Sequence, residues 1–319
     1  MADATDPAPS GSAAAQAGRA GTGGTRCGFI AVLGAPNAGK STLTNRLVGA
    51  KVSIVTPKVQ TTRTRITGIA IQGKSQLIFV DTPGIFEPKR RLDRAMVAAA
   101  WQGARDADVV MLLVDAARGI DRDTRRIVDG LKTARRQAIL VLNKVDLVKK
   151  PSLLELASRL DAEGIFDAIY MISAATGDGV GDLAADLARR IPAGPWLYPA
   201  DQLSDLPERL LAADLVREQL YLQLHQELPY ASAVETESWE ERPDGSVKIQ
   251  AVIYVQREGQ RGIVLGKGGQ QIKSIGEAAR AELEALLGRR VHLFLRVKHQ
   301  ADWDSRREHY RAIGLDFEA

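Results

Sequence analysis

The chain has 319 residues, of which 45% are hydrophobic and 5% aromatic, with a net charge of +4 and a single cysteine. This length suits two ordinary domains with mostly aliphatic cores. The composition excludes an internal disulfide, the apolar runs are too short to cross a bilayer, and the N-terminal tail lacks the apolar stretch of a secretory signal.

Residues 1–26 are mostly Ala, Gly, Ser, Thr and Pro, which predicts a disordered tail because such a segment buries little apolar surface. A transit peptide is the weaker alternative, since two Asp balance two Arg there. Strands are then predicted at residues 29–33, 66–71, 77–80, 109–114, 138–142 and 168–172, and helices at 40–48, 92–103, 122–133, 152–162 and 180–190. The alternation predicts an α/β domain over residues 27–193, with a mostly parallel six-stranded sheet between two layers of helices.

Several prolines mark residues 194–206 as a linker. The pattern that follows predicts a smaller α+β unit over residues 207–319. Its elements are a helix at 208–227, strands at 231–241 and 246–257 around a turn at 242–245, a short helix at 261–265, a long helix ending at 287, and a strand at 291–297.

A phosphate-binding loop is indicated by Gly34–Ser41, which matches the pattern G-x-x-x-x-G-K-S between a predicted strand and a predicted helix. Glycine lets the backbone wrap around phosphate oxygens, and the N–H groups at the helix N-terminus point at the anion. Lys40 supplies positive charge to the outer phosphates, and the Ser41 hydroxyl can bind Mg²⁺.

Further polar motifs follow the later strands. Asp146, in the sequence Asn-Lys-Val-Asp, can accept two hydrogen bonds from guanine, whereas adenine lacks that pair of donors. Asp81, in Asp-Thr-Pro-Gly, can hold the Mg²⁺ shell, and the Gly84 N–H can sense the γ-phosphate. Between these motifs, Thr62 is the preferred threonine to complete the Mg²⁺ shell, with Thr61 kept as the alternative.

These motifs stand in the order of the five guanine-nucleotide boxes, and the chain resembles the TrmE-Era-EngA branch of translation-related GTPases. The second unit resembles the KH domain of the bacterial Era family through residues 228–231, 261–269 and 291–298. The resemblance covers about residues 27–317. It implies a Ras-like G domain joined to a type II KH domain with its core at about 226–302.

The nucleotide-binding residues predicted in this way are Gly34, Ala35, Pro36, Asn37, Ala38, Gly39, Lys40, Ser41, Thr42, Asp81, Thr82, Pro83, Gly84, Asn143, Lys144, Asp146, Ser173 and Ala174. Catalysis is assigned to Asn37, Lys40, Thr62 and Gly84, and Mg²⁺ binding to Ser41, Thr62 and Asp81. The resemblance also implies that Asn37 helps to bind K⁺. Ile85 stands where Ras-type proteins carry a water-orienting Gln, which predicts slow intrinsic turnover.

The RNA-binding residues predicted in the second unit are Arg261, Ile263, Gly266, Lys267, Gly268, Gly269, Ile272 and Lys273. A glycine-rich loop between two helices can clamp a single-stranded backbone. The local excess of Lys and Arg agrees with this, although charge alone favours an ordinary solvated helix face. For the apolar positions Ile263 and Ile272, core packing is the alternative.

The resemblance implies GTP hydrolysis, binding of 16S rRNA near its 3′ end and a role in assembly of the small (30S) ribosomal subunit. It further implies a cytoplasmic monomer with a peripheral contact at the inner membrane. Two other hypotheses are a non-enzymatic RNA-binding scaffold and a tRNA-modification GTPase. The intact Lys40, Ser41, Asp81 and Asp146 oppose the scaffold, and the lack of a C-terminal Cys opposes the tRNA-modification GTPase.

Overall fold

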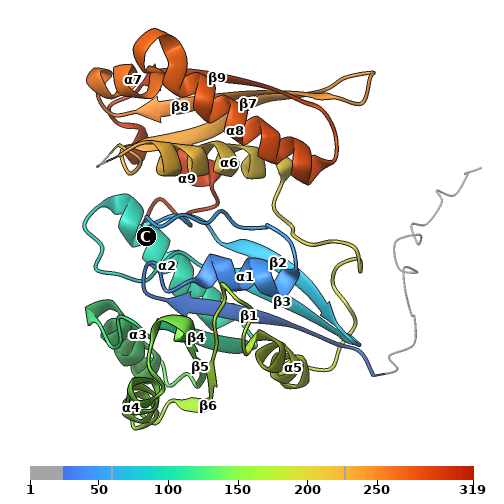
Figure 1. The fold of residues 1–319 in the computed structure, drawn as a ribbon, viewed down its shortest axis with the longest axis vertical. Helices are drawn as coiled ribbons and strands as arrows, with labels where there is room; N and C mark the ends of the chain where they lie inside the picture. The colour runs from blue at the N-terminus through green and yellow to red at the C-terminus, as the bar shows by residue number, and fades with distance from the viewer. Residues whose placement is uncertain (1–23, 59, 226–227) are drawn as a thin grey trace, which may run out of the picture.

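The computed structural model describes residues 24–58, 60–225 and 228–319 (Figure 1). The first unit is built on a six-stranded sheet in the order β2-β3-β1-β4-β5-β6, in which the β2–β3 pair is antiparallel and the other pairs are parallel. The strands are β1 (Arg26–Gly34), β2 (Ile66–Gln72), β3 (Ser75–Asp81), β4 (Val109–Asp115), β5 (Ala138–Asn143) and β6 (Phe166–Met171). This is the mostly parallel sheet that the sequence predicts.

Helices cover both faces of this sheet because alternate strand residues point to opposite sides. On one face, Leu112 and its neighbours pack under α2 (Arg91–Asp106), α3 (Arg122–Thr133) and α4 (Lys150–Asp161). On the other face, Met111 and Leu113 pack under α1 (Lys40–Val48) and α5 (Val180–Arg190). Because β1, β3, β4, β5 and β6 are parallel, their carboxyl ends lie along one edge of the sheet. The polar motifs come directly after these strand ends.

The second unit has a three-stranded sheet in the order β7-β8-β9, with β8 antiparallel to β7 and parallel to β9. Its elements are α6 (Glu208–Gln223), β7 (Ser232–Glu241), β8 (Val247–Val255), α7 (Glu258–Leu265), the 3₁₀ turn η2 (Lys267–Gly269), α8 (Gln270–Leu287) and β9 (Val291–His299). Buried residues of α6 and α8 pack on one face of the sheet. This is the arrangement of a type II KH domain.

Several boundaries differ from the prediction by two to four residues; α7, for example, begins at Glu258 rather than at 261. β1 begins at Arg26, inside the predicted tail, because Thr25 and Cys27 hydrogen-bond the segment around Pro192–Gly194. The rest of the tail, residues 1–23, lies outside the described residues. α6 ends at Gln223 rather than at 227, because Leu224 is extended. β6 begins at Phe166, two residues before the prediction, and ends at Met171.

Two segments make tertiary contacts that were not predicted from the sequence. The predicted linker lies along the edge strand β2, where the Ile69 N–H donates to the Leu203 carbonyl at 2.8 Å. A short C-terminal helix, α9 (Arg307–Ala312), was not predicted. Tyr310 and Leu315 pack on Met96 of α2, so the C-terminal end of the chain returns to the first unit. Among the described residues, no helix is long and apolar enough to span a membrane.

Candidate functional site

The phosphate loop joins the end of β1 to the start of α1. Gly39 caps α1 with a φ of 98°, and a Cβ at this position would lie 2.3 Å from Nδ2 of Asn143. The Asn143 side chain connects the phosphate loop to the segment after β6. Its Nδ2 donates to the Ala38 carbonyl at 2.8 Å, and its Oδ1 accepts from the Ala174 N–H at 2.9 Å. The loop therefore requires glycine at position 39 for both conformation and space.

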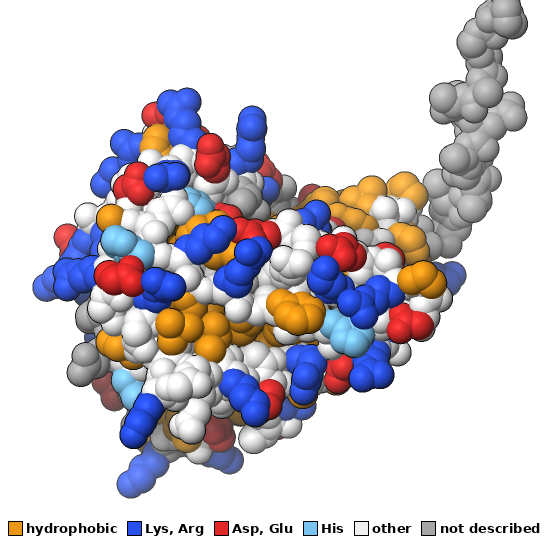
Figure 2. All heavy atoms as spheres, turned by 90° about the horizontal axis from the view of Figure 1, so that it is seen from above, with side chains coloured by type: hydrophobic (Ala, Val, Ile, Leu, Met, Phe, Trp, Pro, Cys, Tyr) orange, Lys and Arg blue, Asp and Glu red, His pale blue; other side chains and the backbone are white. Residues whose placement is uncertain are grey.

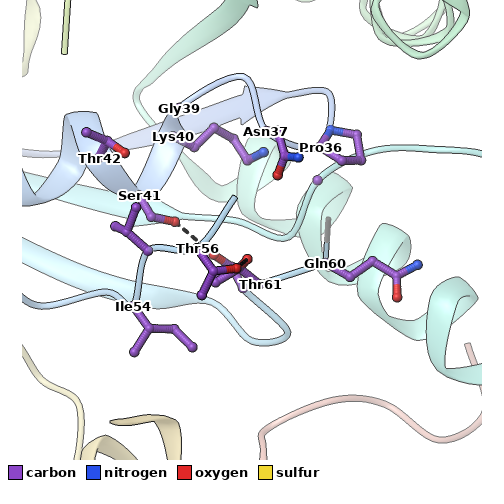
Figure 3. Close-up of a pocket in the computed structure, with 13 residues that line it drawn as sticks. Pro36, Asn37, Gly39, Lys40, Ser41, Thr42, Ile54, Thr56, Gln60 and Thr61 are labelled. Atoms are coloured by element: carbon purple, nitrogen blue, oxygen red, sulfur yellow. Dashed lines mark hydrogen bonds between the residues drawn. The ribbon is translucent and has the colours of Figure 1, made fainter. Parts of the chain in front are cut away.

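Lys40 is buried, and its Nζ donates to the carbonyls of Gly34 and Ala35 at 3.1 Å each. Figure 3 shows its side chain running along the loop toward Asn37. Burial lowers the pKa of Lys40 to about 8, although Asp81 opposes the shift. A phosphate group would replace the two carbonyls as the partner of this cation.

This pKa predicts a pH dependence of nucleotide binding. The phosphates need the protonated form of Lys40, which the free protein loses as the pH rises through about 8. We expect GDP affinity to be level below pH 7 and to fall by up to about tenfold per unit between pH 8 and 9. Calorimetry in buffers of different ionisation enthalpy would measure the proton taken up on binding. Binding without proton uptake at pH 8.5 would contradict the assignment.

Three hydroxyl and carboxylate groups converge beside Lys40. The Ser41 hydroxyl donates to Oδ2 of Asp81 at 2.7 Å, and it lies 2.8 Å from Oγ1 of Thr62. Burial raises the pKa of Asp81, which Ser41 and Lys40 oppose. Oδ1 of Asp81 is buried and has no hydrogen-bond partner among the described residues. An unpaired buried carboxylate oxygen beside two hydroxyls fits the oxygen ligands that Mg²⁺ prefers.

The geometry favours Thr62 over Thr61 as the threonine of this cluster. The Thr61 hydroxyl donates to the Lys58 carbonyl at 2.8 Å and lies 2.7 Å from the hydroxyl of Thr56. Thr61 therefore stabilises its own loop, whereas Thr62 faces Ser41. The cavity bounded by the phosphate loop and by residues 54–56 and 60–62 is about 60 Å³, room for a few water molecules, so a nucleotide must move these side chains (Figure 3).

Residues 82–85, directly after β3, are buried. The Thr82 hydroxyl donates to the Val32 carbonyl at 2.8 Å, so it points away from the nucleotide loop. A Cβ on Gly84 would lie 3.0 Å from the backbone of Pro36, so a larger residue here would press on the phosphate loop. Ile85 is completely buried. The Ile85 side chain therefore does not line the cavity beside the phosphate loop. This agrees with the expectation from the sequence that residue 85 does not orient the attacking water.

The groups expected at the base lie at the ends of β5 and β6. Lys144 crosses the phosphate loop, and its Nζ donates to the Asn37 carbonyl at 2.9 Å and pairs with Asp115 at 2.6 Å. Asp146 is exposed and makes no hydrogen bond or ion pair with the described residues. Ser173 and Ala174 are buried beside Asn143. Thr42 lies in the first turn of α1 and lines the cavity.

Two residues at this site were missed from the sequence. Asp115, at the end of β4, pairs with Lys144, and Arg118, in the next turn, donates from Nη1 to the Pro36 carbonyl at 3.2 Å. Asp115 occupies the same sheet edge as the motif residues, so its position after a buried strand is the signal that could have found it. A single Arg in a loop carries no comparable pattern.

The predicted RNA loop separates α7 from α8. Gly266, Gly268 and Gly269 all have positive φ, and Gly269 caps the N-terminus of α8. Open space surrounds Gly268 and Gly269, whereas a Cβ on Gly266 would meet Gln271 at 2.6 Å. Lys267 is exposed and forms no ion pair with the described residues. The loop thus presents backbone, one cation and a helix N-terminus to solvent.

The other predicted RNA residues divide into two groups. Ile263 is 59% exposed, whereas Ile272 packs against the core of the unit. Arg261 pairs with Glu258 at 3.0 Å, and Lys273 lies 3.9 Å from Glu277. Figure 2, which looks onto this end of the molecule, shows Lys and Arg side chains mixed with acidic ones around small hydrophobic areas. The loop, rather than a broad basic face, is the distinctive feature.

The sheet, the phosphate loop and the second unit define a GTP-binding protein with a Ras-like G domain and a KH domain. Residues 29–144 match the family described as 50S ribosome-binding GTPase, and residues 227–304 match the KH domain. GTPase Era of Rhizobium meliloti (strain 1021) is 59% identical over 293 residues, which cover 92% of this chain and 94% of that protein. The chain belongs to the Era family, and it is a GTPase.

Two solved structures are similar over nearly the whole chain. One is Aquifex aeolicus Era bound to GDP·AlF4⁻, with a TM-score of 0.86, 38% identity, and coverage of 91% of this chain and 99% of that one. The other is Era in complex with MgGDPNP and nucleotides 1506–1542 of 16S ribosomal RNA, with a TM-score of 0.87 and the same identity and coverage. The sequence therefore predicted both the family and the two-domain fold correctly.

Proposed function

We propose that this GTPase is a switch that binds 16S rRNA near its 3′ end through its KH domain and acts in assembly of the small (30S) ribosomal subunit. The exposed loop of Lys267 at the N-terminus of α8 is the observation that carries the proposal. The complex of a similar Era with a 16S rRNA fragment supports this choice of RNA. The G domain runs from β1, which begins at Arg26, to residue 193, and the KH-containing domain spans residues 207–319.

In this proposal, the described side chains divide the work of binding nucleotide. Lys40 leaves its two carbonyl partners for the outer phosphates, and Asp146 accepts hydrogen bonds from the guanine. Ser41, Thr62 and Asp81 hold Mg²⁺, which neutralises charge on the phosphates when it is bound. The N–H of Gly84, a residue that packs on Pro36, senses the γ-phosphate. No side chain at position 85 orients the attacking water, so intrinsic hydrolysis is slow.

RNA affinity measured in three nucleotide states tests the switch. The full-length protein is titrated into a labelled single-stranded oligonucleotide of the 16S 3′ end with GDPNP, with GDP and without nucleotide. We expect the GDPNP form to bind most tightly, because a nucleotide favours RNA only if one domain arrangement binds both. Equal affinity in all three states would contradict the switch, and no affinity in any would contradict RNA binding by the KH domain.

Asn37 motivates a requirement for K⁺. Its backbone has a φ of 64°, and its Nδ2 donates to the Pro57 carbonyl at 2.9 Å, which leaves the side-chain oxygen as a cation ligand. A bound cation there would supply positive charge in place of an arginine finger. We expect hydrolysis to be at least about tenfold faster in K⁺ than in Na⁺ at equal ionic strength. Asn37→Ala should remove the difference, and equal wild-type rates in both salts would contradict the role.

The family resemblance alone supports a cytoplasmic monomer with a peripheral contact at the inner membrane. Analytical ultracentrifugation of the purified chain would test the monomer. Separation of cell membranes from the cytoplasm at low and high salt would test the membrane contact, because a peripheral association mediated by charge is lost as salt rises.

A further inference from the structure

The segment of residues 51–63, here called the switch segment, connects α1 to β2 and carries Thr62. Its described residues lie between the phosphate loop and the KH domain. Ile54 is 1% exposed, and it packs with Ala212 and Leu215 of α6 and with Leu283 of α8. A side chain of the G domain is thus part of the KH-domain core, and this contact ties the switch segment to α6 by burial of apolar surface.

Glu218 of α6 anchors the first half of the switch segment. Its Oε1 accepts the Val55 N–H at 2.9 Å, and its Oε2 pairs with Nζ of Lys51 at 2.6 Å. The carboxylate is 4% exposed, so both of its oxygens depend on these partners. The first half of the switch segment is therefore held in place, N-terminal to Thr62.

Two buried arginines hold the residues on either side of Thr62. Arg217 of α6, oriented by Asp214 at 2.7 Å, donates from Nη1 to the Thr61 carbonyl at 2.5 Å. Arg63 reaches into the KH domain, where Nη1 donates to the Ser232 carbonyl at 2.8 Å and Nη2 donates to the Tyr221 hydroxyl at 3.1 Å. Both guanidinium groups are almost completely buried. The main chain of Thr62 is therefore anchored to the KH domain from both sides.

We propose that Arg217 and Arg63 are positioning residues that hold Thr62 beside Ser41 and Asp81 of the G domain. This inference rests on the proposed role of Thr62 as a Mg²⁺ ligand. Ordering a loop costs conformational entropy, and the anchors on α6 order the switch segment before nucleotide binds. GDP has no γ-phosphate and does not need Thr62, so the anchors favour GTP over GDP. By linkage, GTP then favours the domain arrangement in which they form.

The test compares the affinities of the full-length protein for labelled GDPNP and labelled GDP, both with Mg²⁺. For Arg217→Ala, we expect GDPNP affinity to fall by about tenfold and the Mg²⁺ concentration that half-saturates GDPNP binding to rise, with GDP affinity unchanged. Tyr221→Phe removes only the hydroxyl that accepts from Arg63. It should lower GDPNP affinity by about threefold, and it covers the case in which Arg217→Ala fails to fold.

Arg209→Ala is the matched control. Arg209 lies on the same helix, and it donates to the carbonyl of Glu237 within the KH domain at 2.9 Å rather than to the switch segment. Its loss should leave the ratio of GDPNP to GDP affinity unchanged. Equal losses of both nucleotides in Arg217→Ala, or unchanged ratios in both Arg217→Ala and Tyr221→Phe, would overturn the inference.

Thr62→Ala separates this inference from the proposed function. If Thr62→Ala lowers the ratio of GDPNP to GDP affinity and the Arg217 and Tyr221 variants do not, the metal role of Thr62 stands and positioning by the KH domain fails. If Thr62→Ala leaves the ratio unchanged, the proposed metal role of Thr62 fails, and with it the basis for the inference.

Discussion

Asp146→Asn should change the base that this GTPase prefers from guanine to xanthine. The carboxylate lies in the 3₁₀ turn after β5, exposed and without a partner among the residues that the structure describes, where it can accept two hydrogen bonds from a guanine. An amide at this position would present a donor to the guanine amine, which is also a donor. Hydrogen bonds to charged groups contribute about 1.5–3 kcal/mol each, so GTP affinity should fall by roughly 100-fold.

The affinity for xanthosine nucleotides should rise as the affinity for GTP falls, because xanthine carries an oxygen where guanine carries the amine. Competition of GDP and xanthosine diphosphate for a labelled nucleotide measures both effects in one experiment. Asp161→Asn, at the C-terminal end of α4, is the matched control, since it removes an exposed charge far from the phosphate loop. Unchanged GDP affinity in Asp146→Asn, or equal weakening of both nucleotides, would contradict base recognition by this residue.

Changing Gly268 and Gly269 together to Asp should abolish most RNA binding. Both have positive φ and open space around them, so new side chains would project toward solvent rather than into the protein. Two negative charges would then occupy the place where phosphates approach the N-terminus of α8. We expect RNA affinity to fall by roughly 100-fold, with GDP affinity unchanged. The measurement is titration of the full-length protein with the same single-stranded oligonucleotide.

The double variant Gly245→Asp, Gly288→Asp is the matched control for this experiment. Gly245 lies in the β7–β8 turn and Gly288 caps the other end of α8; both also have positive φ and open surroundings. Both double variants therefore introduce two Asp at positions with positive φ and open surroundings. An equal loss of RNA affinity in both would mean that charge or folding, rather than the loop of Lys267, explains the effect. Lys267→Ala should weaken binding less and reduce its salt dependence, because one phosphate contact is lost.

The predicted switch does not depend on the proline-rich segment alone. Residues 194–206 join the domains covalently, but Ser204 and Leu203 are held against β2. The contacts that hold the residues beside Thr62 come from Arg217 and Glu218 of α6 and from Arg63, which donates to the Ser232 carbonyl of β7. Variants of α6 should therefore affect GTP discrimination more strongly than variants of the linker.

The sequence by itself determined the elements of the G domain and the family. α1, α3 and α5 begin and end where the apolar periodicity predicts, because each helix carries its own amphipathic pattern between a strand and a turn. The phosphate loop could also be predicted from the sequence, since wrapping a backbone around phosphate requires a fixed spacing of glycine, Lys40 and Ser41 within eight consecutive residues. These features depend on local chemistry, which the order of residues expresses directly.

Only the tertiary structure decided how distant segments meet. The sequence prefers Thr62 to Thr61 and keeps both, whereas the structure shows that the Thr62 hydroxyl faces Ser41 and the Thr61 hydroxyl bonds within its own loop. The burial of Ile54 in the KH domain and the return of Tyr310 to α2 likewise join residues that are far apart along the chain. Periodicity reports which face of an element is apolar, but it does not identify the partner that covers that face. That partner is selected by the packing of the whole molecule.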